Sequence, residues 1–181
     1  MLFRSAKQTN YCDNADCFNE GYMTVELDTY GTGTTNNPTL YTDWTQKLDQ
    51  KNDCESDANC YNYADLIYTA YAKNNAKITS VSNQQVTQSN YCDDDATCAN
   101  IGFVTNNVYA ENNAKLTATA NQVLNQNCNI SGGSCINYNE VTTSGEAINN
   151  AVSLSYTANQ NINQFDSSPA EIDISRSSGS T

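Results

Sequence analysis

The segment Tyr91-Cys92-Asp93-Asp94-Asp95-Ala96-Thr97-Cys98-Ala99-Asn100 decides the fold, because it is the clearest copy of a unit that occurs four times in the chain. Aligned on the second cysteine, every copy reads Cys-x-Asn, at Cys17-Phe18-Asn19, Cys60-Tyr61-Asn62, Cys98-Ala99-Asn100 and Cys135-Ile136-Asn137. The first cysteines of successive copies are 42, 38 and 36 residues apart, a spacing typical of an internal repeat. The sequence therefore predicts a four-repeat protein.

A second landmark supports the repeat. Three copies reach the pattern Ala-x-Asn-Asn-Ala fourteen positions after the second cysteine, with asparagine pairs at Asn74-Asn75, Asn112-Asn113 and Asn149-Asn150. The first copy has its pair five residues later, at Asn36-Asn37, after an insertion-like run at 31–35. Asparagine tolerates the positive φ of a tight turn, and an exposed turn tolerates an insertion. We expect a turn at each asparagine pair.

The side-chain pattern around these turns favours β-structure. Residues 22–28 alternate apolar and polar side chains before a turn rich in Gly, Thr, Asn and Pro. Alternation returns after the later asparagine pairs, at 76–80, 114–120 and 152–158, in runs rich in β-branched residues and Tyr. The prediction is an all-β fold of four disulfide-braced, β-hairpin-like repeats of about 36–42 residues in one domain.

The alternative is an all-α bundle with one long helix per repeat. Val104, Val108 and Leu116 can share one helical stripe, and a helix as long as the unit would have about 26 residues. Gly102, Gly145 and the many Asn and Thr residues disfavour it. Single-helix units also cannot stack by translation, because every second copy would run backwards. The β-fold is favoured, and the helical alternative stays open.

The predicted boundaries follow the repeats. Residues 1–9 form an N-terminal segment, 10–165 the four-repeat domain, and 166–181 a linker with a C-terminal strand or tail. The repeats span about 10–51, 52–89, 90–126 and 127–165. Both terminal segments carry apolar pairs outside the repeat register, which we expect to act as assembly strands that exchange between subunits: Leu2 and Phe3, and Ile172 and Ile174.

Eight cysteines in four close pairs predict disulfides and an extracellular or cell-surface location. Local pairing is simplest, at about 2 kcal/mol of stabilisation per bond, although a ladder between neighbouring units is the alternative. The gaps of four to six residues are longer than zinc-binding pairs usually show. The predicted local pairs are Cys12 with Cys17, Cys54 with Cys60, Cys92 with Cys98, and Cys128 with Cys135. Residues 1–7 lack the apolar core of a secretory signal, so we expect prior processing or another export route.

Composition excludes several function classes. The chain has 20 Asp and Glu against 8 Lys and Arg, a net charge of -12, which disfavours nucleic acid and anionic membranes as partners. It has no His, the commonest general base and transition-metal ligand. No apolar run approaches the about 18 residues of a membrane span. We recognise no catalytic constellation and predict a protein that is not an enzyme.

Two loops suggest ligands or modification. Asp93, Asp94 and Asp95 offer clustered oxygens of the kind calcium prefers, and calcium is the one cofactor we consider. A solvated acidic turn is the favoured explanation of this triplet, because it lacks the glycine and glutamate of an EF-hand loop. The fourth loop has no acid and contains the sequon Asn129-Ile130-Ser131, so Asn129 is the predicted glycosylation site.

The sequence therefore predicts a structural role. We expect an extracellular subunit of a filament, appendage or surface layer, whose partners are copies of itself, joined through terminal strands. The alternative is an adhesin or carbohydrate-binding module that stacks glycans on Tyr side chains and Trp44, with calcium in the acidic loops.

Overall fold

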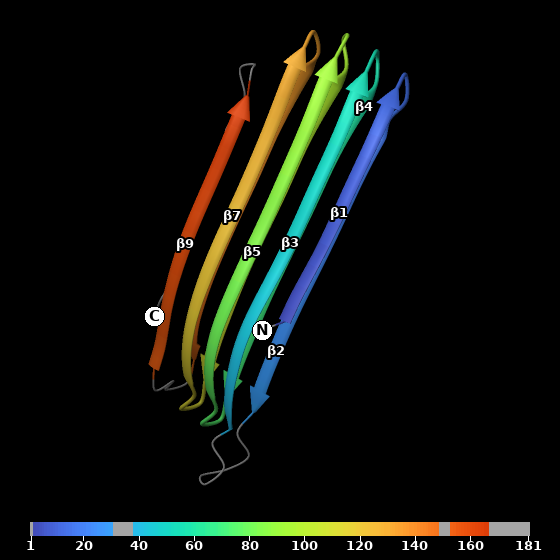
Figure 1. Ribbon diagram of the computed structural model, residues 1–181. Coiled ribbons are helices and arrows are strands. Elements are labelled where there is room, and N and C mark those ends of the chain that lie inside the picture. The colour runs from blue at the N-terminus through green and yellow to red at the C-terminus, as the bar shows by residue number, and fades with distance from the viewer. Residues whose placement is uncertain (1, 31–37, 149–152, 167–181) are drawn as a thin grey trace.

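The computed structural model describes the backbone of residues 2–30, 38–148 and 153–166, and the side chains of 2–30 and 38–146. Nine strands form, and no helix occurs among the described residues, so none could cross a membrane. The helical alternative is therefore wrong (Figure 1). The strands are β1 (Leu2–Asp13), β2 (Cys17–Tyr30), β3 (Thr39–Glu55), β4 (Asn59–Lys73), β5 (Lys77–Asp93), β6 (Thr97–Glu111), β7 (Lys115–Ser131), β8 (Ser134–Ile148) and β9 (Ser153–Asp166).

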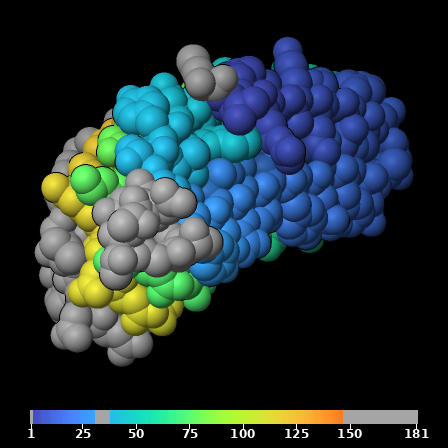
Figure 2. All heavy atoms as spheres, turned by 90° about the horizontal axis from the view of Figure 1, so that it is seen from below, coloured from blue at the N-terminus to red at the C-terminus, as the bar shows by residue number. Residues whose placement is uncertain are grey.

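The strands form a two-sheet solenoid of about four turns. The odd sheet has the order β1-β3-β5-β7-β9 and the even sheet the order β2-β4-β6-β8. All neighbours within a sheet are parallel and in register, so that Cys60 lies beside Cys98 and Leu48 beside Val86. We call an odd strand together with the even strand that follows it a rung. Viewed along the strands, the rungs follow one another from the blue N-terminal rung to the yellow residues (Figure 2).

The predicted all-β repeat is confirmed, and the structure refines the hairpin-like unit. The two strands of a unit lie in opposite sheets, and each pairs with its equivalents in neighbouring units instead of with its partner strand. The boundary proposed at residue 9 is not a structural one. Residues 2–9 are the first part of β1, which pairs with β3 from Leu2 to Asp13.

The interior is layered along the strand direction. An apolar layer near the asparagine turns contains Ile78, Leu116 and Val108, and a second layer at mid-strand contains Leu48, Leu66 and Leu124. The third layer consists of the cysteines with Ala58 and Ala96. Buried Gln and Asn side chains separate the three layers. Parallel stacking in register places buried amides beside amides of the next strand, such as Gln84 beside Gln122, so a core with buried amides becomes feasible.

The asparagine pairs at 74–75 and 112–113 form the predicted turns. Asn74 and Asn75 have φ of 52° and 66°, and Asn112 and Asn113 have φ of 54° and 61°. The backbone nitrogen of Ala76 closes the first of these turns by donating to the Lys73 oxygen at 3.3 Å. Two consecutive positive φ values are a conformation in which Asn is favoured over most residues. Asn36-Asn37 and Asn149-Asn150 lie outside the described residues.

Candidate assembly site at the solenoid ends

The cysteines form the four predicted local disulfides along one edge of the solenoid. Cys12–Cys17, Cys54–Cys60, Cys92–Cys98 and Cys128–Cys135 have Cα–Cα distances of 6.1 to 6.5 Å. Each bond joins the two sheets within one rung. Among the described residues, the only sets of three side chains whose ligand atoms lie within 4.8 Å of one another consist of these bonded cysteines. They are therefore a covalent brace.

The acidic triplet is part of a turn. Asp94 and Asp95 have φ of 43° and 64°, and the Ala96 nitrogen donates to the Asp93 oxygen at 3.1 Å. The Asp93 carboxylate accepts the Asp94 backbone N–H at 3.0 Å. Like Asn, Asp tolerates positive φ, so the turn alone explains these residue types. The carboxylate oxygens of these three residues do not all lie within 4.8 Å of one another.

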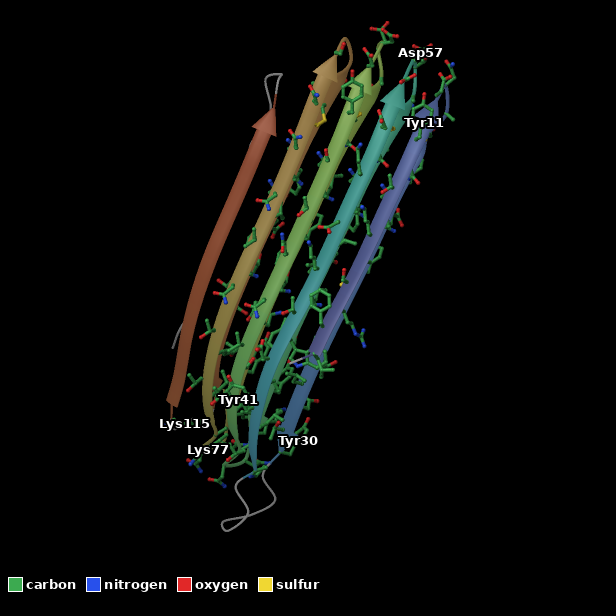
Figure 3. The ribbon with its side chains drawn as sticks, viewed as in Figure 1. Tyr11, Tyr30, Tyr41, Asp57, Lys77 and Lys115 are labelled. Atoms are coloured by element: carbon green, nitrogen blue, oxygen red, sulfur yellow. A yellow bond between two sulfur atoms is a disulfide. The ribbon has the colours of Figure 1, made fainter. Side chains whose placement is uncertain are left out.

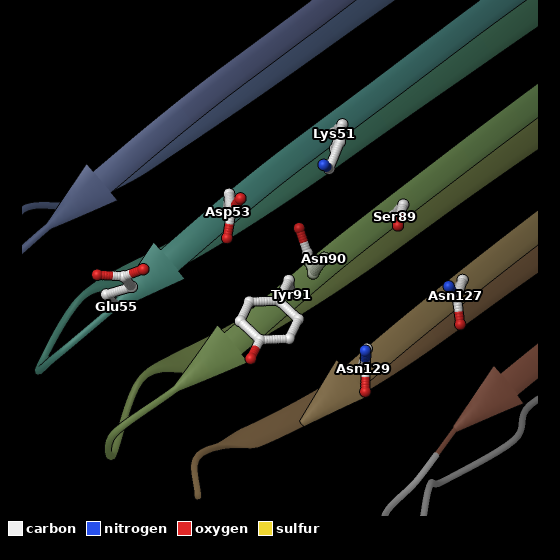
Figure 4. Close-up of a pocket in the computed structure, with 8 residues that line it drawn as sticks. All are labelled: Lys51, Asp53, Glu55, Ser89, Asn90, Tyr91, Asn127 and Asn129. Atoms are coloured by element: carbon white, nitrogen blue, oxygen red, sulfur yellow. The ribbon is translucent and has the colours of Figure 1, made fainter. Parts of the chain in front are cut away.

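Asn129 lies exposed on the outer face of β7, in a shallow polar hollow of the odd sheet (Figure 4). Lys51, Asp53, Glu55 and Tyr91 are among its lining residues. Nearby on β1, the Tyr11 hydroxyl donates to Glu55 at 3.0 Å, and this hydrogen bond and the carboxylate charge raise the pKa of Tyr11. The hollow is lined by positively and negatively charged groups that can form hydrogen bonds, and it is open to solvent.

The outer face of the even sheet carries a zigzag of rings, formed by Tyr22, Tyr63, Phe103 and Tyr138. Successive ring centroids are 5.3, 5.6 and 5.8 Å apart. The rings are tilted against one another by 42° to 54°, and Tyr22 is 63% exposed. Partial burial beside them raises the pKa of Asp65.

Trp44 does not form a sugar-stacking surface. It is partly buried and packs against the apolar layer near the asparagine turns. Trp44 therefore lies apart from the rings on the outer face of the even sheet.

The N-terminal end of the solenoid is an open strand edge. β1 pairs with β3 on one side, and no described strand covers its other side. Leu2 and Phe3 on this strand are 58% and 59% exposed. Ile172 and Ile174, the C-terminal assembly residues predicted from sequence, lie outside the described residues. An open edge with exposed apolar side chains is a template for another strand.

Two glutamine columns run through the odd sheet and have a direction. In one, Gln84 Nε2 donates to Gln46 Oε1 at 3.0 Å, and Gln122 Nε2 to Gln84 Oε1 at 3.2 Å. Gln84 Nε2 also lies 3.1 Å from the Leu66 and Thr105 backbone oxygens. Carbonyl oxygens only accept, so the amide nitrogen must occupy this position. Gln84 and Gln122 thus both donate towards the N-terminal end of the column.

The second glutamine column repeats the direction. Gln50 Nε2 donates to Gln8 Oε1 at 2.8 Å, Gln88 to Gln50 at 2.9 Å, and Gln126 to Gln88 at 2.7 Å. At its C-terminal end the buried Oε1 of Gln126 has no hydrogen-bond partner among the described atoms. Gln164 is the residue in register beside Gln126.

An asparagine column in the even sheet runs in the opposite direction. Asn19 Nδ2 donates to Asn62 Oδ1 at 3.0 Å, Asn62 to Asn100 at 2.9 Å, and Asn100 to Asn137 at 2.8 Å. At the N-terminal end, Asn10 closes the column by donating to Asn19 Oδ1 at 3.0 Å. Both kinds of column give the two ends of the solenoid different hydrogen-bonding chemistry.

Sequence reasoning missed the glutamine columns, although a signal was present. The spacing Gln-x-x-x-Gln recurs at the same place in successive units, at 46–50, 84–88, 122–126 and 160–164. Comparison of the chain with protein-family models, curated proteins and solved structures finds no match.

Proposed function

We propose that this protein is an extracellular structural subunit that joins end to end into a filament, an appendage or a surface layer. The observation that carries the proposal is the open parallel edge of β1, backed by buried amide columns that run along the stacking direction. Four intramolecular disulfides are typical of extracellular proteins and support this location. A second copy is a natural partner, because its own strands have the matching period.

The number of strands determines what a joint requires. The described solenoid begins and ends with an odd strand, with five strands in the odd sheet and four in the even sheet. If β1 of one copy pairs with β9 of another, one even strand is missing at the joint. We propose that residues 170–175, which alternate apolar and polar side chains, supply it by strand exchange through the apolar residues Ile172 and Ile174.

Negative-stain microscopy of the non-reduced protein tests the proposal, with concentration-dependent polymers as the expected result. Deletion of 166–181 should leave folded monomers. Ile172→Asn/Ile174→Asn should weaken assembly, whereas Glu171→Gln/Asp173→Asn changes the alternate positions and serves as the matched control. Unchanged polymers after the deletion would contradict the strand-exchange joint. Monomers at every concentration would contradict the structural role.

A second candidate function, binding of glycans with calcium, rests on the polar hollow around Tyr91 and Asn129. Glycan-array binding that is lost on chelation, and on Tyr91→Ala but not Tyr41→Ala, would favour it. Tyr41 is the control because it is 69% exposed on an odd strand away from the hollow. Glycosylation at Asn129 is tested by the mass shift between wild type and Asn129→Gln from a glycosylating host.

A further inference from the structure

Arg4 interrupts one of the glutamine columns at the first strand. The register places Arg4 beside Gln46, in the column that continues through Gln84 and Gln122. The backbone register of β9 adds Gln160 at the other end of this column. On the same strand, Gln8 occupies the equivalent place in the second column and accepts from Gln50. Arg4 thus stands at an interior-facing position where every other strand of the sheet has Gln.

The substitution changes what this end of the column can do. A glutamine at this position could accept a hydrogen bond from Gln46, but a guanidinium has donors only. Gln46 Nε2 instead donates to the Met23 oxygen at 2.9 Å and the Ile67 oxygen at 3.3 Å. The column therefore ends at Gln46 within its own chain, and Arg4 is exposed to solvent.

The C-terminal end of the odd sheet presents hydrogen-bond acceptors, so a strand that joins it must supply donors. Since each amide donates towards the N-terminal end, a carbonyl oxygen is the group left at the C-terminal end of a column. An arriving strand that continues a column must therefore donate to the strand before it.

We propose that Arg4 makes the end-to-end joint directional, its guanidinium donating to the glutamine column of the preceding copy at Gln160. This inference rests on the proposed function and specifies its joint. Continuation of the repeat register pairs β1 of the second copy with β9 of the first, with Arg4 opposite Gln160, Gln8 opposite Gln164, and Asn10 opposite Asp166.

Head-to-head contact of two N-terminal ends is disfavoured by the same residue. From Leu2 to Cys12, β1 carries Arg4 and Lys7 and no acid, so two such strands would bring four cations together. Each buried guanidinium would also lack a column oxygen, and a buried charge without a partner is costly. The charge of Arg4 at an inward position of the edge strand therefore disfavours the head-to-head joint and permits the joint between β1 and β9.

The matched experiment compares Arg4→Glu and Arg4→Gln with Lys7→Glu and Lys7→Gln, which make the same charge changes at an outward-facing position of β1. The critical concentration for polymer formation is measured by sedimentation, with circular dichroism as the check on folding. Arg4→Glu should raise the critical concentration by about tenfold or more relative to Lys7→Glu, because Glu cannot donate to the column. Arg4→Gln should assemble, since Gln both donates and accepts.

The direction of the joint is read by a photo-crosslinking amino acid at Ser5, with the products identified by mass spectrometry. Wild type should crosslink to 153–166 of another copy, and Arg4→Gln should add crosslinks between two β1 strands. Crosslinks between β1 strands in wild type, or equal effects of Arg4→Glu and Lys7→Glu in a protein that assembles, would overturn this inference alone. The absence of polymer in wild type would overturn the proposed function and the inference with it.

Discussion

At both edges of the solenoid the chain reverses direction between the two sheets, but the residues that form the turns differ. At the disulfide edge, Asp94 and Asp95 reverse the chain between sheets with φ of 43° and 64°. At the asparagine edge, Asn112 and Asn113 do so with φ of 54° and 61°. A buried alanine follows each pair, Ala96 in the first case and Ala114 in the second. These two turns therefore share a pair of positive φ values, with the covalent bond as an addition at the disulfide edge, whereas the preceding disulfide-edge turn has a positive φ only at Ser56, of 59°.

The surroundings of the turns differ in charge. Tyr11 and Asp57 mark the disulfide edge, whereas Lys77 and Lys115 lie at the asparagine edge (Figure 3). At the asparagine edge Lys73 also pairs with Glu111 at 3.2 Å, and Asn112 donates to Asn74 at 3.0 Å. Both edges thus have polar contacts between rungs, such as that of Tyr11 with Glu55 at the disulfide edge, and the disulfide edge adds a covalent bond within each rung.

Removal of an internal disulfide should have the largest effect. Cys54→Ala/Cys60→Ala should lower the free energy of unfolding by about 2–4 kcal/mol, from lost loop closure and a cavity among fully buried sulfurs. Denaturant titration measures this free energy of unfolding. Cys12→Ala/Cys17→Ala removes a similar loop at the more exposed N-terminal end and should lose less. Equal losses would show that sulfur packing contributes nothing at this edge.

Disruption of the buried glutamine column between the two edges should have the second-largest effect on stability. Gln84→Leu leaves the oxygen of Gln46 and the amide of Gln122 without their column partner, and should lower the free energy of unfolding by about 1–3 kcal/mol. Gln85→Leu is the control, because its side chain is on the outer face of the same strand and only half-buried. Chemical denaturation of both variants gives the comparison. A similar stability for the two would mean that the buried column does not hold the rungs together.

The turn residues provide the third comparison. Asn75→Ala should cost about 1–2 kcal/mol because alanine resists positive φ, whereas Asn75→Gly should be nearly neutral. The pair Asp95→Ala and Asp95→Gly should give the same difference at the disulfide edge, measured by thermal unfolding. A difference confined to the asparagine edge would show that the disulfide imposes the turn on its neighbours.

The repeat, the disulfides and the turns were predictable because each has a local signature. The Cys-x-Asn alignment matches the pairing of Cys60 with Cys98, and the asparagine pairs have the expected φ. The partner of each strand was not predictable in the same way. Alternation such as that of residues 22–28 indicates that one face of a strand is buried. The same pattern is expected whether two successive strands pair as a hairpin or lie in two facing sheets.

The candidate assembly site was only half visible in the sequence. Leu2 and Phe3 stood out as apolar residues near a terminus, and they lie on the open edge. Arg4 beside them looked like an ordinary surface charge. Its place in a glutamine column follows only from the parallel register, which aligns residues 42 and 38 positions apart. Nothing in the local sequence around Arg4 encodes that alignment.

The smallest expected effect comes from giving the disulfide edge the residues of the asparagine edge. Asp94→Asn/Asp95→Asn keeps the turn that both residue types accept, so the free energy of unfolding should change by less than about 0.5 kcal/mol. If the acids serve the turn alone, millimolar Ca²⁺ should shift the Tm of neither wild type nor variant. A rise in wild type that the variant lacks would instead assign calcium to Asp93, Asp94 and Asp95. The acids at this edge would then bind a ligand, which the asparagines at the other edge cannot do without carboxylate charge.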